Sequence, residues 1–480
     1  MPRTLTIVQM NDSHAYFEPH PELFWSGDRA VYRMAGGYAR IAGALSAIRA
    51  ERPGAVLAFD GGDTLHGTYA AVHTRGEALV PVLEALRFDA MTAHWDFAYG
   101  PDRLRELAGR LPYPVLAANI YDEASGERPF PAWRVVEAGG LRAGVIGLAA
   151  VIAGTIMPPQ FREGLRFTLG NAELPGLIDH LRREERADLV VVLSHLGFPQ
   201  DMKLAHEVPG IDVLLSSHTH NRLYRPARAG ETLVIQSGSH GAFLGRLDLE
   251  VEGGRVVNYR HELLTIDDQI APDPAVEAVV SDVLAPYHAE LGEVVGRVAT
   301  PLNRATALES TMDNFLLQGL QHATGASLAF SNGWRYGAPV LPGPVTRDDL
   351  HNIIPVNPPV SLVDLTGDEI WTLLEENLEH TYARDPYGQK GGYVKRALGL
   401  TAIIKIENPP GTRLQELFIE GQPVDRAATY TATFVTTQGV PPKFGTNRRD
   451  LSLRAVDALA AYLASAPEIA APLRETFVVV

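Results

Sequence analysis

Short apolar runs alternate with amphipathic stretches through the first half of the chain, and this alternation is the strongest constraint on the fold. Runs typical of β-strands include 5–10, 55–59, 115–118 and 189–193, and helical patterns lie between most of them. Such alternation predicts an α/β sheet whose faces are covered by helices. Sites in these sheets assemble beyond the ends of the strands. The residues that follow each run are therefore the first candidates for chemistry.

The chain is too long for one hydrophobic core. It has 480 residues, whereas a single core stops growing at roughly 250–300 residues, so we expect two domains. The first α/β pattern closes with an antiparallel pair around Gly253-Gly254, and an acidic helical stretch follows at 272–291. The expected parts are a catalytic domain over 1–265, a helical linker or hinge over 266–295, and a second domain over 296–480.

Composition excludes several classes of function. The net charge of −15 argues against binding a nucleic acid polymer, which needs clustered Lys and Arg. Because the chain has no cysteine, any metal must be held by His, Asp, Glu, Asn or Gln. We expect no membrane span, since no apolar run reaches the ~20 residues that a span requires. A strand pattern begins almost at Met1, so we expect a cytoplasmic protein, or an exported one if the native start lies upstream.

Clusters of Asp and His follow five of the predicted strands. Alone, Asp12 could be a helix cap, and the glycine-rich stretch that carries Asp63 could be a plain turn. Together, the clusters supply enough N and O ligands for two divalent transition metals, with positions left for water and substrate. The candidate ligands are Asp12, His14, Asp63, His94, His195, His218 and His220.

The order of these clusters, D-x-H, G-G-D, S-H and H-x-H, resembles that of the calcineurin-type metallophosphoesterases. It is most similar to the group of 5′-nucleotidases and 2′,3′-cyclic-nucleotide phosphodiesterases. The resemblance implies an N-terminal four-layer α/β/β/α metallophosphoesterase domain and a C-terminal α/β substrate-binding domain of the 5′-nucleotidase type. It also implies two ligand sets joined by a bridging carboxylate. These are Asp12, His14 and His220 for one metal, His94, His195 and His218 for the other, and Asp63 as the bridge.

The resemblance also implies a reaction. In such enzymes a water that bridges the two metals is the nucleophile, and the substrate is a small anionic phosphate ester such as a nucleotide. We expect Mn as the metal, although a His-rich site also accepts Zn, Fe, Co or Ni. The candidate catalytic residues are Asp63, His94, Asp96 and Arg335.

The second half of the chain carries matching motifs. The segment Ser331-Asn332-Gly333-Trp334-Arg335 is similar to the family segment that holds a substrate-binding Asn and Arg. A guanidinium suits a phosphate or a carboxylate because it can bind either through two hydrogen bonds. Nucleotidases of this type stack the base between two aromatic rings, although aromatic residues also build cores. The candidate substrate-binding residues are Asn332, Arg335, Tyr387, Tyr393 and Phe444.

The third cluster departs from the nucleotidase pattern G-N-H-E-x-D. His94 stands in place of the Asn ligand, Trp95 in place of the catalytic His, and Ala98 in place of its Asp partner. The family's His–Asp dyad is therefore absent. The candidates for a replacement acid are His66, Tyr99 and His240, each of which can equally be an ordinary packed residue.

Another branch of the same fold offers an alternative function. The string H-W-D-F-A-Y-G at 94–100 is similar to H-W-E-F-T-Y-G of the Sox-pathway thiosulfohydrolases, and 385–396 is similar to a Gln-Gly-Gly segment of that branch. Those enzymes release sulfate from a cysteine-bound thiosulfonate on a carrier protein. A thiol has a pKa of about 8.5, so a leaving thiolate needs less help from an acid than a leaving alkoxide does. We therefore keep three functions: a phosphoester hydrolase first, a thiosulfohydrolase second, and a non-catalytic metal- or ligand-binding relative third.

Overall fold

The computed structural model describes residues 2–154 and 157–480, which form two compact units. Unit 1 comprises Met1–His20 and Arg33–Pro286, and unit 2 comprises Pro21–Tyr32 and Tyr287–Val480. Unit 2 therefore includes most of an early hairpin, β2 (His20–Ser26) and β3 (Arg29–Ala35), as well as the second half of the chain. None of the helices in the described part of the chain is both long and apolar enough to cross a membrane.

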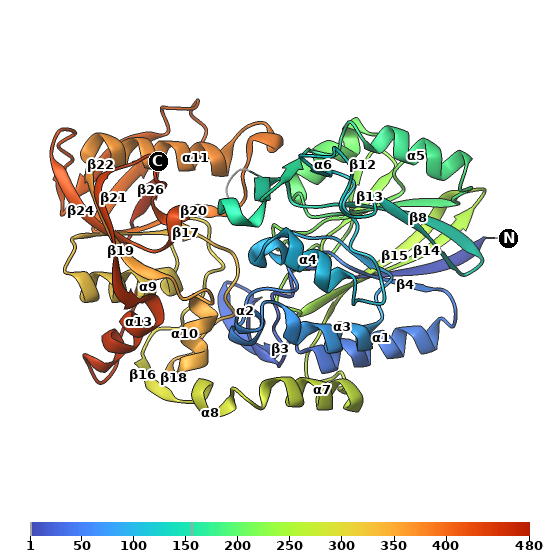
Figure 1. Ribbon diagram of the computed structural model, residues 1–480, viewed down its shortest axis with the longest axis horizontal. Helices are drawn as coiled ribbons and strands as arrows, with labels where there is room; N and C mark the ends of the chain where they lie inside the picture. The colour runs from blue at the N-terminus through green and yellow to red at the C-terminus, as the bar shows by residue number, and fades with distance from the viewer. Residues whose placement is uncertain (1, 155–156) are drawn as a thin grey trace. The chain divides into compact units, whose positions relative to one another are not determined.

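Unit 1 contains two large β-sheets (Figure 1). The first sheet runs, in spatial order, β15 (Arg255–Thr265), β14 (Phe243–Glu252), β1 (Arg3–Met10), β4 (Val56–Asp60) and β5 (Ala90–Met91). The second runs β12 (Ala227–Ala229), β13 (Thr232–Ile235), β11 (Val213–Leu215), β10 (Leu189–Ser194), β8 (Leu141–Leu148) and β7 (Trp133–Ala138). Strand β4 is parallel to β1, and β11 is parallel to β10, so the carboxyl ends of each pair meet at one edge.

A hydrophobic core fills the space between these two sheets. Ile7 and Phe59 reach into it from the first sheet, and Val191, Val213 and Ile235 reach into it from the second. The central strands β10 and β11 of the second sheet are buried on both faces, which explains why they appear in the sequence as continuous apolar runs rather than alternating ones.

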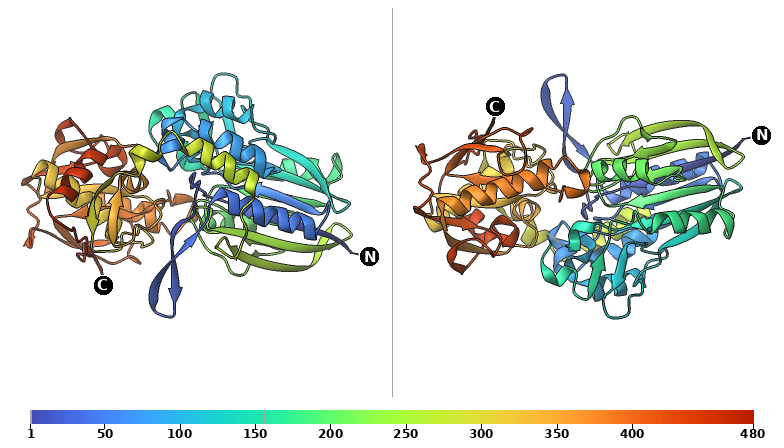
Figure 2. Two further views of the ribbon diagram at one scale, coloured as in Figure 1. Left: turned by 90° about the horizontal axis from the view of Figure 1, so that it is seen from below. Right: turned by 90° about the horizontal axis from the view of Figure 1, so that it is seen from above.

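Helices cover the outer faces of the two sheets. Helices α5 (Leu174–Arg183) and α6 (Phe198–Glu207) pack on the second sheet through a core that includes Ile178 and Leu204. Figure 2 shows α1 (Tyr38–Glu51), α3 (Val80–Leu86) and α7 (Pro274–Leu284) side by side along the first sheet. The four-layer α/β/β/α order expected from the sequence is confirmed. The smaller elements of unit 1 are α2 (Tyr69–His73), α4 (Pro101–Ala108), β6 (Ile120–Asp122), β9 (Leu165–Phe167) and the 3-10 helices η1 (Glu77–Leu79), η2 (Trp95–Tyr99), η3 (Val151–Gly154) and η4 (Pro159–Phe161).

Two local expectations are wrong. Residues 115–118 form one isolated bridge, from Val115 to Met91, and then donate backbone hydrogen bonds to three different segments, so the run is a buried connection and not a strand. The helix expected over 272–291 is two helices, α7 and α8 (His288–Leu291). Pro286 separates them because its ring clashes with a preceding helical turn and it has no N–H to donate.

Unit 2 is built on a mixed five-stranded sheet. Its spatial order is β20 (Tyr393–Leu398), β17 (Leu328–Gly333), β24 (Thr429–Phe434), β19 (Pro359–Thr366) and β25 (Thr446–Arg454). A smaller sheet contains β23 (Gln422–Pro423), β22 (Leu414–Ile419), β21 (Leu400–Ile404) and β26 (Phe477–Val479). The other elements are β16 (Val294–Val298), β18 (Gly343–Thr346), α9 (Thr311–Thr324), α10 (Arg347–Ile353), α11 (Gly367–Tyr382), η5 (Pro386–Gly388), α12 (Thr436–Gly439) and α13 (Ala455–Ala464).

Helix α11 is central to this unit. It starts with a capping box in which the Thr366 side chain accepts from the Glu369 backbone while the Glu369 side chain accepts from the Thr366 backbone. Its residues Leu374 and Leu378 pack into the core with Phe330 and Leu417, which come from the two sheets. The helix therefore forms a fixed base for the loops that pass over it.

Candidate metal centre

All the predicted metal ligands lie in unit 1, just beyond the ends of strands. Asp12 and His14 follow β1, Asp63 follows β4, and His94 follows β5. In the second sheet, His195 follows β10, and the pair His218 and His220 follows β11. Parallel pairing brings the strand ends together within each sheet, and the packing of the two sheets brings the two sets of ends together, so residues more than 200 positions apart in the chain meet in one place.

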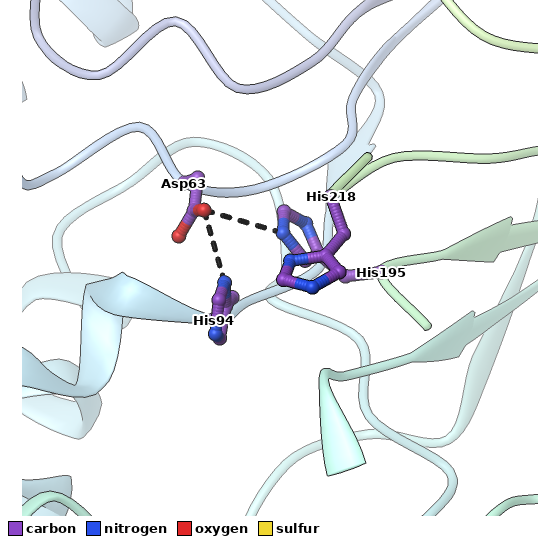
Figure 3. A group of neighbouring side chains, drawn as sticks. All are labelled: Asp63, His94, His195 and His218. Atoms are coloured by element: carbon purple, nitrogen blue, oxygen red, sulfur yellow. Dashed lines mark hydrogen bonds and ion pairs between the residues drawn. The ribbon is translucent and has the colours of Figure 1, made fainter. Parts of the chain in front are cut away.

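The first group of ligands is Asp63, His94, His195 and His218, whose ligand atoms lie within 4.8 Å of one another (Figure 3). Asp63 Oδ2 is 2.9 Å from His94 Nδ1 and 3.4 Å from His195 Nε2. The four side chains come from different loops and point toward one another, as the ligands of one ion do.

The second group is Asp12, His14 and His220, again with ligand atoms within 4.8 Å of one another. His14 Nε2 is 3.2 Å from His220 Nε2, and Asp12 Oδ1 is 3.3 Å from the same His220 atom. The two groups are contiguous, because His195 Nε2 is 3.5 Å from Asp12 Oδ1 and His14 Nε2 is 3.9 Å from Asp63 Oδ2. Asp63 Oδ2 therefore faces ligands of both groups, as a bridging carboxylate does.

The geometry of the site fits two divalent ions. Two ligand atoms about 2.1 Å from one ion lie roughly 3.0–3.4 Å apart at angles of about 90–110°. The four separations given above within the two groups, 2.9, 3.4, 3.2 and 3.3 Å, are close to this size. Asp12 Oδ1, His94 Nε2 and His195 Nε2 are buried and have no hydrogen-bond partner among the described residues. Leaving such atoms unsatisfied costs about 1–3 kcal/mol each, and bound cations would remove that cost.

Neighbouring groups fix which atom of each ligand points into the site. The Nδ1–H of His195 donates to the Gly61 carbonyl at 2.6 Å, which leaves Nε2 for the site. Asp12 Oδ2 accepts from Asn11 Nδ2 at 2.7 Å and from the His218 backbone at 2.9 Å, which leaves Oδ1. Asp63 Oδ1 accepts from the Trp95 backbone at 2.6 Å, which leaves Oδ2.

Several ligands have a strained backbone. Asp12, His14, Asp63, His218 and His220 all have φ between 49° and 73°, which is uncommon for residues other than glycine. Such a conformation costs of order 1–3 kcal/mol at each position and persists only where the surroundings enforce it. The fold thus spends stability to aim these side chains at the site.

Buried carboxyl and imidazole groups in the site shift each other's pKa values. Burial raises the pKa of the Asp63 carboxyl, but His94 and His195 outweigh burial and hold that pKa well below its ordinary value. Burial lowers the pKa of His195, but Asp12 and Asp63 outweigh it and raise that pKa to about 10. The carboxylates are therefore ionised. A divalent cation would replace the histidine protons and balance the negative charge of these carboxylates.

Asp96 lies beneath the site. Its Oδ2 accepts from the backbone N–H groups of Asp63 and His94, both at 3.0 Å, and its Oδ1 accepts from those of Thr64 at 3.1 Å and Leu65 at 2.8 Å. With both oxygens occupied, Asp96 holds the loops that carry Asp63 and His94. This placement supports a positioning role rather than contact with substrate.

The three candidates for a replacement acid have different surroundings. The Tyr99 hydroxyl lies 3.1 Å from the Leu65 carbonyl and 3.0 Å from the Ala71 carbonyl, so its proton is committed to the backbone. The His66 ring is buried and stacks on Trp95 with centroids 5.1 Å apart, and neither ring nitrogen has a hydrogen-bond partner. The His240 ring lies 5.8 Å from that of His220, beside the second ligand group.

The candidate substrate residues lie in unit 2. Asn332 and Arg335 are half-buried, and Arg335 Nη2 donates to the Gly392 carbonyl at 3.0 Å. The Arg335 guanidinium lies over the Tyr393 ring at 5.2 Å, and Tyr387 is also half-buried. The structure packs Phe444 into the hydrophobic core with 6% exposure, which leaves little of its ring for a substrate.

Sequence reasoning missed the polar residues behind the ligands. Asn11 fixes Asp12 and also donates to the Gly238 carbonyl at 2.8 Å. Buried Asp201 accepts from the hydroxyls of Ser194 and Ser216, both at 2.6 Å, and so joins the ends of β10 and β11. Burial raises the pKa of Asp201 to about 7. Asn11 adjoins a ligand and could have been found, whereas nothing in the sequence around Asp201 indicates its partners.

Comparison with known proteins finds similar hydrolases. Residues 294–437 match the family 5′-nucleotidase, C-terminal domain. The chain is 24% identical over 477 residues to the trifunctional nucleotide phosphoesterase protein YfkN of Bacillus subtilis. The match covers 89% of this chain but only 31% of that protein.

Two solved structures from Thermus thermophilus are similar along nearly the whole chain. The sulfate thiohydrolase SoxB is 28% identical, with a TM-score of 0.91, and the match covers 99% of this chain and 96% of that one. A 5′-nucleotidase precursor is 25% identical, with a TM-score of 0.86, and the match covers 99% of each chain. The two neighbours represent the two enzyme classes that the sequence motifs resemble.

Proposed function

This chain belongs to the 5′-nucleotidase family of calcineurin-like phosphoesterases, and we propose from that premise that it is a dinuclear metal-dependent hydrolase of nucleotides or related phosphate esters. The observation that carries the proposal is the convergence of seven buried or half-buried ligand side chains in two contiguous groups. Relatives named for nucleotide phosphoesterase and 5′-nucleotidase activity support the substrate class.

The residues of this chain have separate tasks in the proposed reaction. Two divalent ions held by the two groups would supply Lewis-acid polarisation of the ester and a lowered pKa for the attacking water. Asp63 faces both groups and keeps the two ligand sets at a fixed spacing. Asp96 holds the Asp63 and His94 backbones in place through its hydrogen bonds. Arg335 binds an anionic group of the substrate, for which its planar guanidinium is suited.

We propose Mn as the metal in this site. Neutral imidazoles and carboxylates bind Mn, and they also bind Zn, Fe, Co and Ni. The availability of each ion in the cell therefore decides which one is bound. The described residues of the site offer no thiolate ligand, since the chain has no cysteine.

A second candidate function is that of a thiosulfohydrolase, and one observation favours it. Trp95 occupies the position where nucleotidases carry a catalytic histidine, and its backbone N–H binds Asp63 at 2.6 Å while its ring stacks on His66. A leaving thiolate needs less help from an acid than a leaving alkoxide does. The similarity to a sulfate thiohydrolase supports this alternative, which would take a substrate on a carrier protein.

A hydrolysis screen separates these functions. The Mn-loaded chain is given nucleoside monophosphates, cyclic nucleotides, p-nitrophenyl phosphate and a cysteine S-sulfonate, each with and without a chelator. Chelator-sensitive phosphate release supports the leading proposal. Turnover of the sulfur compound alone supports the second candidate, and hydrolysis of none of them would support a binding protein that has lost catalysis.

A further inference from the structure

The chain uses lysine sparingly. Lysine and arginine together number 42, and only five of these residues are lysines. The five are Lys203, Lys390, Lys395, Lys405 and Lys443. Lysine is a compact point charge that binds phosphate-like anions without the geometric demands of arginine. The places where this scarce residue is concentrated are therefore informative.

Three of the five lysines contact one turn of helix α11 in unit 2, Lys443 through its ammonium and Lys390 and Lys395 through their backbones. Lys443 Nζ donates to Glu376 Oε1 at 2.7 Å, the Lys395 backbone donates to Asn377 Oδ1 at 2.6 Å, and the Lys390 backbone donates to the His380 carbonyl at 3.0 Å. The lysines are up to 53 residues apart in the sequence: Lys390 lies in the loop before β20, Lys395 in β20 itself, and Lys443 in the loop between α12 and β25. We name these three residues the lysine cluster.

Lys395 is the most unusual member of the cluster. It is 4% exposed, and its ammonium donates to the Gln438 carbonyl at 2.6 Å. No carboxylate in the described part of the chain pairs with it. Burial lowers the pKa of Lys395 to about 8, which still leaves it mostly charged at neutral pH. A buried cation without a counter-ion is costly, so a bound anion would stabilise this arrangement.

Acidic residues do not neutralise the cluster. Glu376 is bound by Lys443, but Glu375 accepts from the backbones of Arg413 and Leu414, and Glu379 pairs with the Arg413 guanidinium. Among the described ion pairs, Glu376 is the one carboxylate that binds a lysine of the cluster. The half-buried His380 registers the same excess of positive charge, since burial and then Lys390, Lys395 and Lys443 lower its pKa. Within a chain of net charge −15, this is a local attraction for anions.

The cluster adjoins the motif that the sequence assigns to substrate. Gln438, whose carbonyl binds Lys395, accepts at its side chain from Trp334 Nε1 at 3.0 Å. Arg335 binds the Gly392 carbonyl, in the loop between Lys390 and Lys395. Trp334 is thus bound by helix α12, and Arg335 by the loop between Lys390 and β20.

We propose that Lys390, Lys395 and Lys443 form an oxyanion subsite of unit 2, which binds a phosphate, sulfate or carboxylate group other than the one that is hydrolysed. The group belongs either to a substrate with a second anionic end or to a free anion. The assignment of the bound group to a substrate rests on the proposed function, whereas the binding of a free oxyanion does not.

Calorimetric titration of the Mn-loaded full chain with inorganic sulfate tests the subsite, at low salt and in the Asp63→Asn background so that the metal centre contributes less. Lys443→Gln, an exposed change that leaves the core intact, and Lys395→Met, which keeps the buried aliphatic stem, should each weaken sulfate binding at least tenfold. Glu376→Gln should tighten it, because a competing carboxylate is removed. The two remaining lysines provide matched controls, Lys203→Gln and Lys405→Gln, which should leave it unchanged. Equal sulfate affinity in all these variants would overturn the proposal.

Kinetics then identify the source of the anion. The KM of a phosphate ester with a second anionic group is compared with that of p-nitrophenyl phosphate in the wild-type chain and in Lys443→Gln. A rise in KM of about tenfold for the first substrate alone assigns the subsite to substrate. Lysine-dependent sulfate binding with both KM values unchanged assigns it to a free anion. Absence of any hydrolysis contradicts the proposed function but leaves the sulfate titration as an independent test.

Discussion

Replacing Asp96 by Asn tests how the fold holds the bridging carboxylate. The Asp96 carboxylate accepts four backbone N–H groups, two at each oxygen. An asparagine keeps one acceptor oxygen and places an NH2 group where the other stood. In either orientation of the amide, two backbone N–H groups lose their acceptor and face a donor. One orientation releases Asp63 and His94, and the other releases Thr64 and Leu65.

The cost follows from the number of lost bonds. A hydrogen bond to a charged group contributes about 1.5–3 kcal/mol, so losing two costs about 3–6 kcal/mol. This cost falls on the loops that carry Asp63 and His94, because Asp96 binds no other backbone in the described residues. Each ~1.4 kcal/mol is a tenfold change in an equilibrium, so local opening should become about 10²- to 10⁴-fold more frequent.

Amide hydrogen exchange read by mass spectrometry measures this opening directly. Peptides that cover 61–68 and 92–98 should lose protection in Asp96→Asn, and the same variant should bind Mn more weakly. Asp102→Asn is the matched control, because the Asp102 side chain is 92% exposed and pairs only with Arg105 on the surface of α4. Unchanged protection and Mn affinity in Asp96→Asn would refute the view that this carboxylate positions the site.

Three further changes have defined outcomes. Asp63→Asn should reduce metal-dependent turnover by at least about 10³-fold while the chain stays folded, since it removes the carboxylate that faces both ligand groups, and near-normal activity would contradict its bridging role. Arg335→Ala should raise KM far more than it lowers kcat, with partial recovery in Arg335→Lys; unchanged kinetics would remove it from the substrate site. Burial lowers the pKa of His351 to about 4, so the folded state favours its neutral form. Stability should therefore be full above pH 6.5 and fall by up to about 3 kcal/mol as pH drops toward 4, a slope that His351→Gln should flatten in acid titrations followed by circular dichroism.

Much of the site could be predicted because its ligands directly follow strands. Apolar runs such as 189–193 identify buried parallel strands, and parallel strands bring the polar residues after them to one edge. Short local signals therefore place His195 near His218, and the family resemblance adds Asp12, which follows a strand of the other sheet. The alternation predicts a sheet covered by helices, and the four-layer order is implied by the family resemblance.

What could not be predicted depends on contacts between distant segments. The run 115–118 has the composition of a strand, but its N–H groups find partners in three segments, which no local pattern reveals. The left-handed backbone of Asp12 and Asp63 is imposed by tertiary packing against the preference of these residues. The lysine cluster is invisible in the sequence, since Lys443 joins Lys390 and Lys395 only through helix α11.

The central claim is that two divalent ions share the ligands around Asp63. Its most direct test is the metal content of the chain by mass spectrometry after stripping with a chelator and reloading with Mn, measured together with phosphate release. We expect saturation at two ions per chain, with activity lost on stripping and restored on reloading. Saturation at one ion or none, or phosphate release that survives the chelator, would contradict the account.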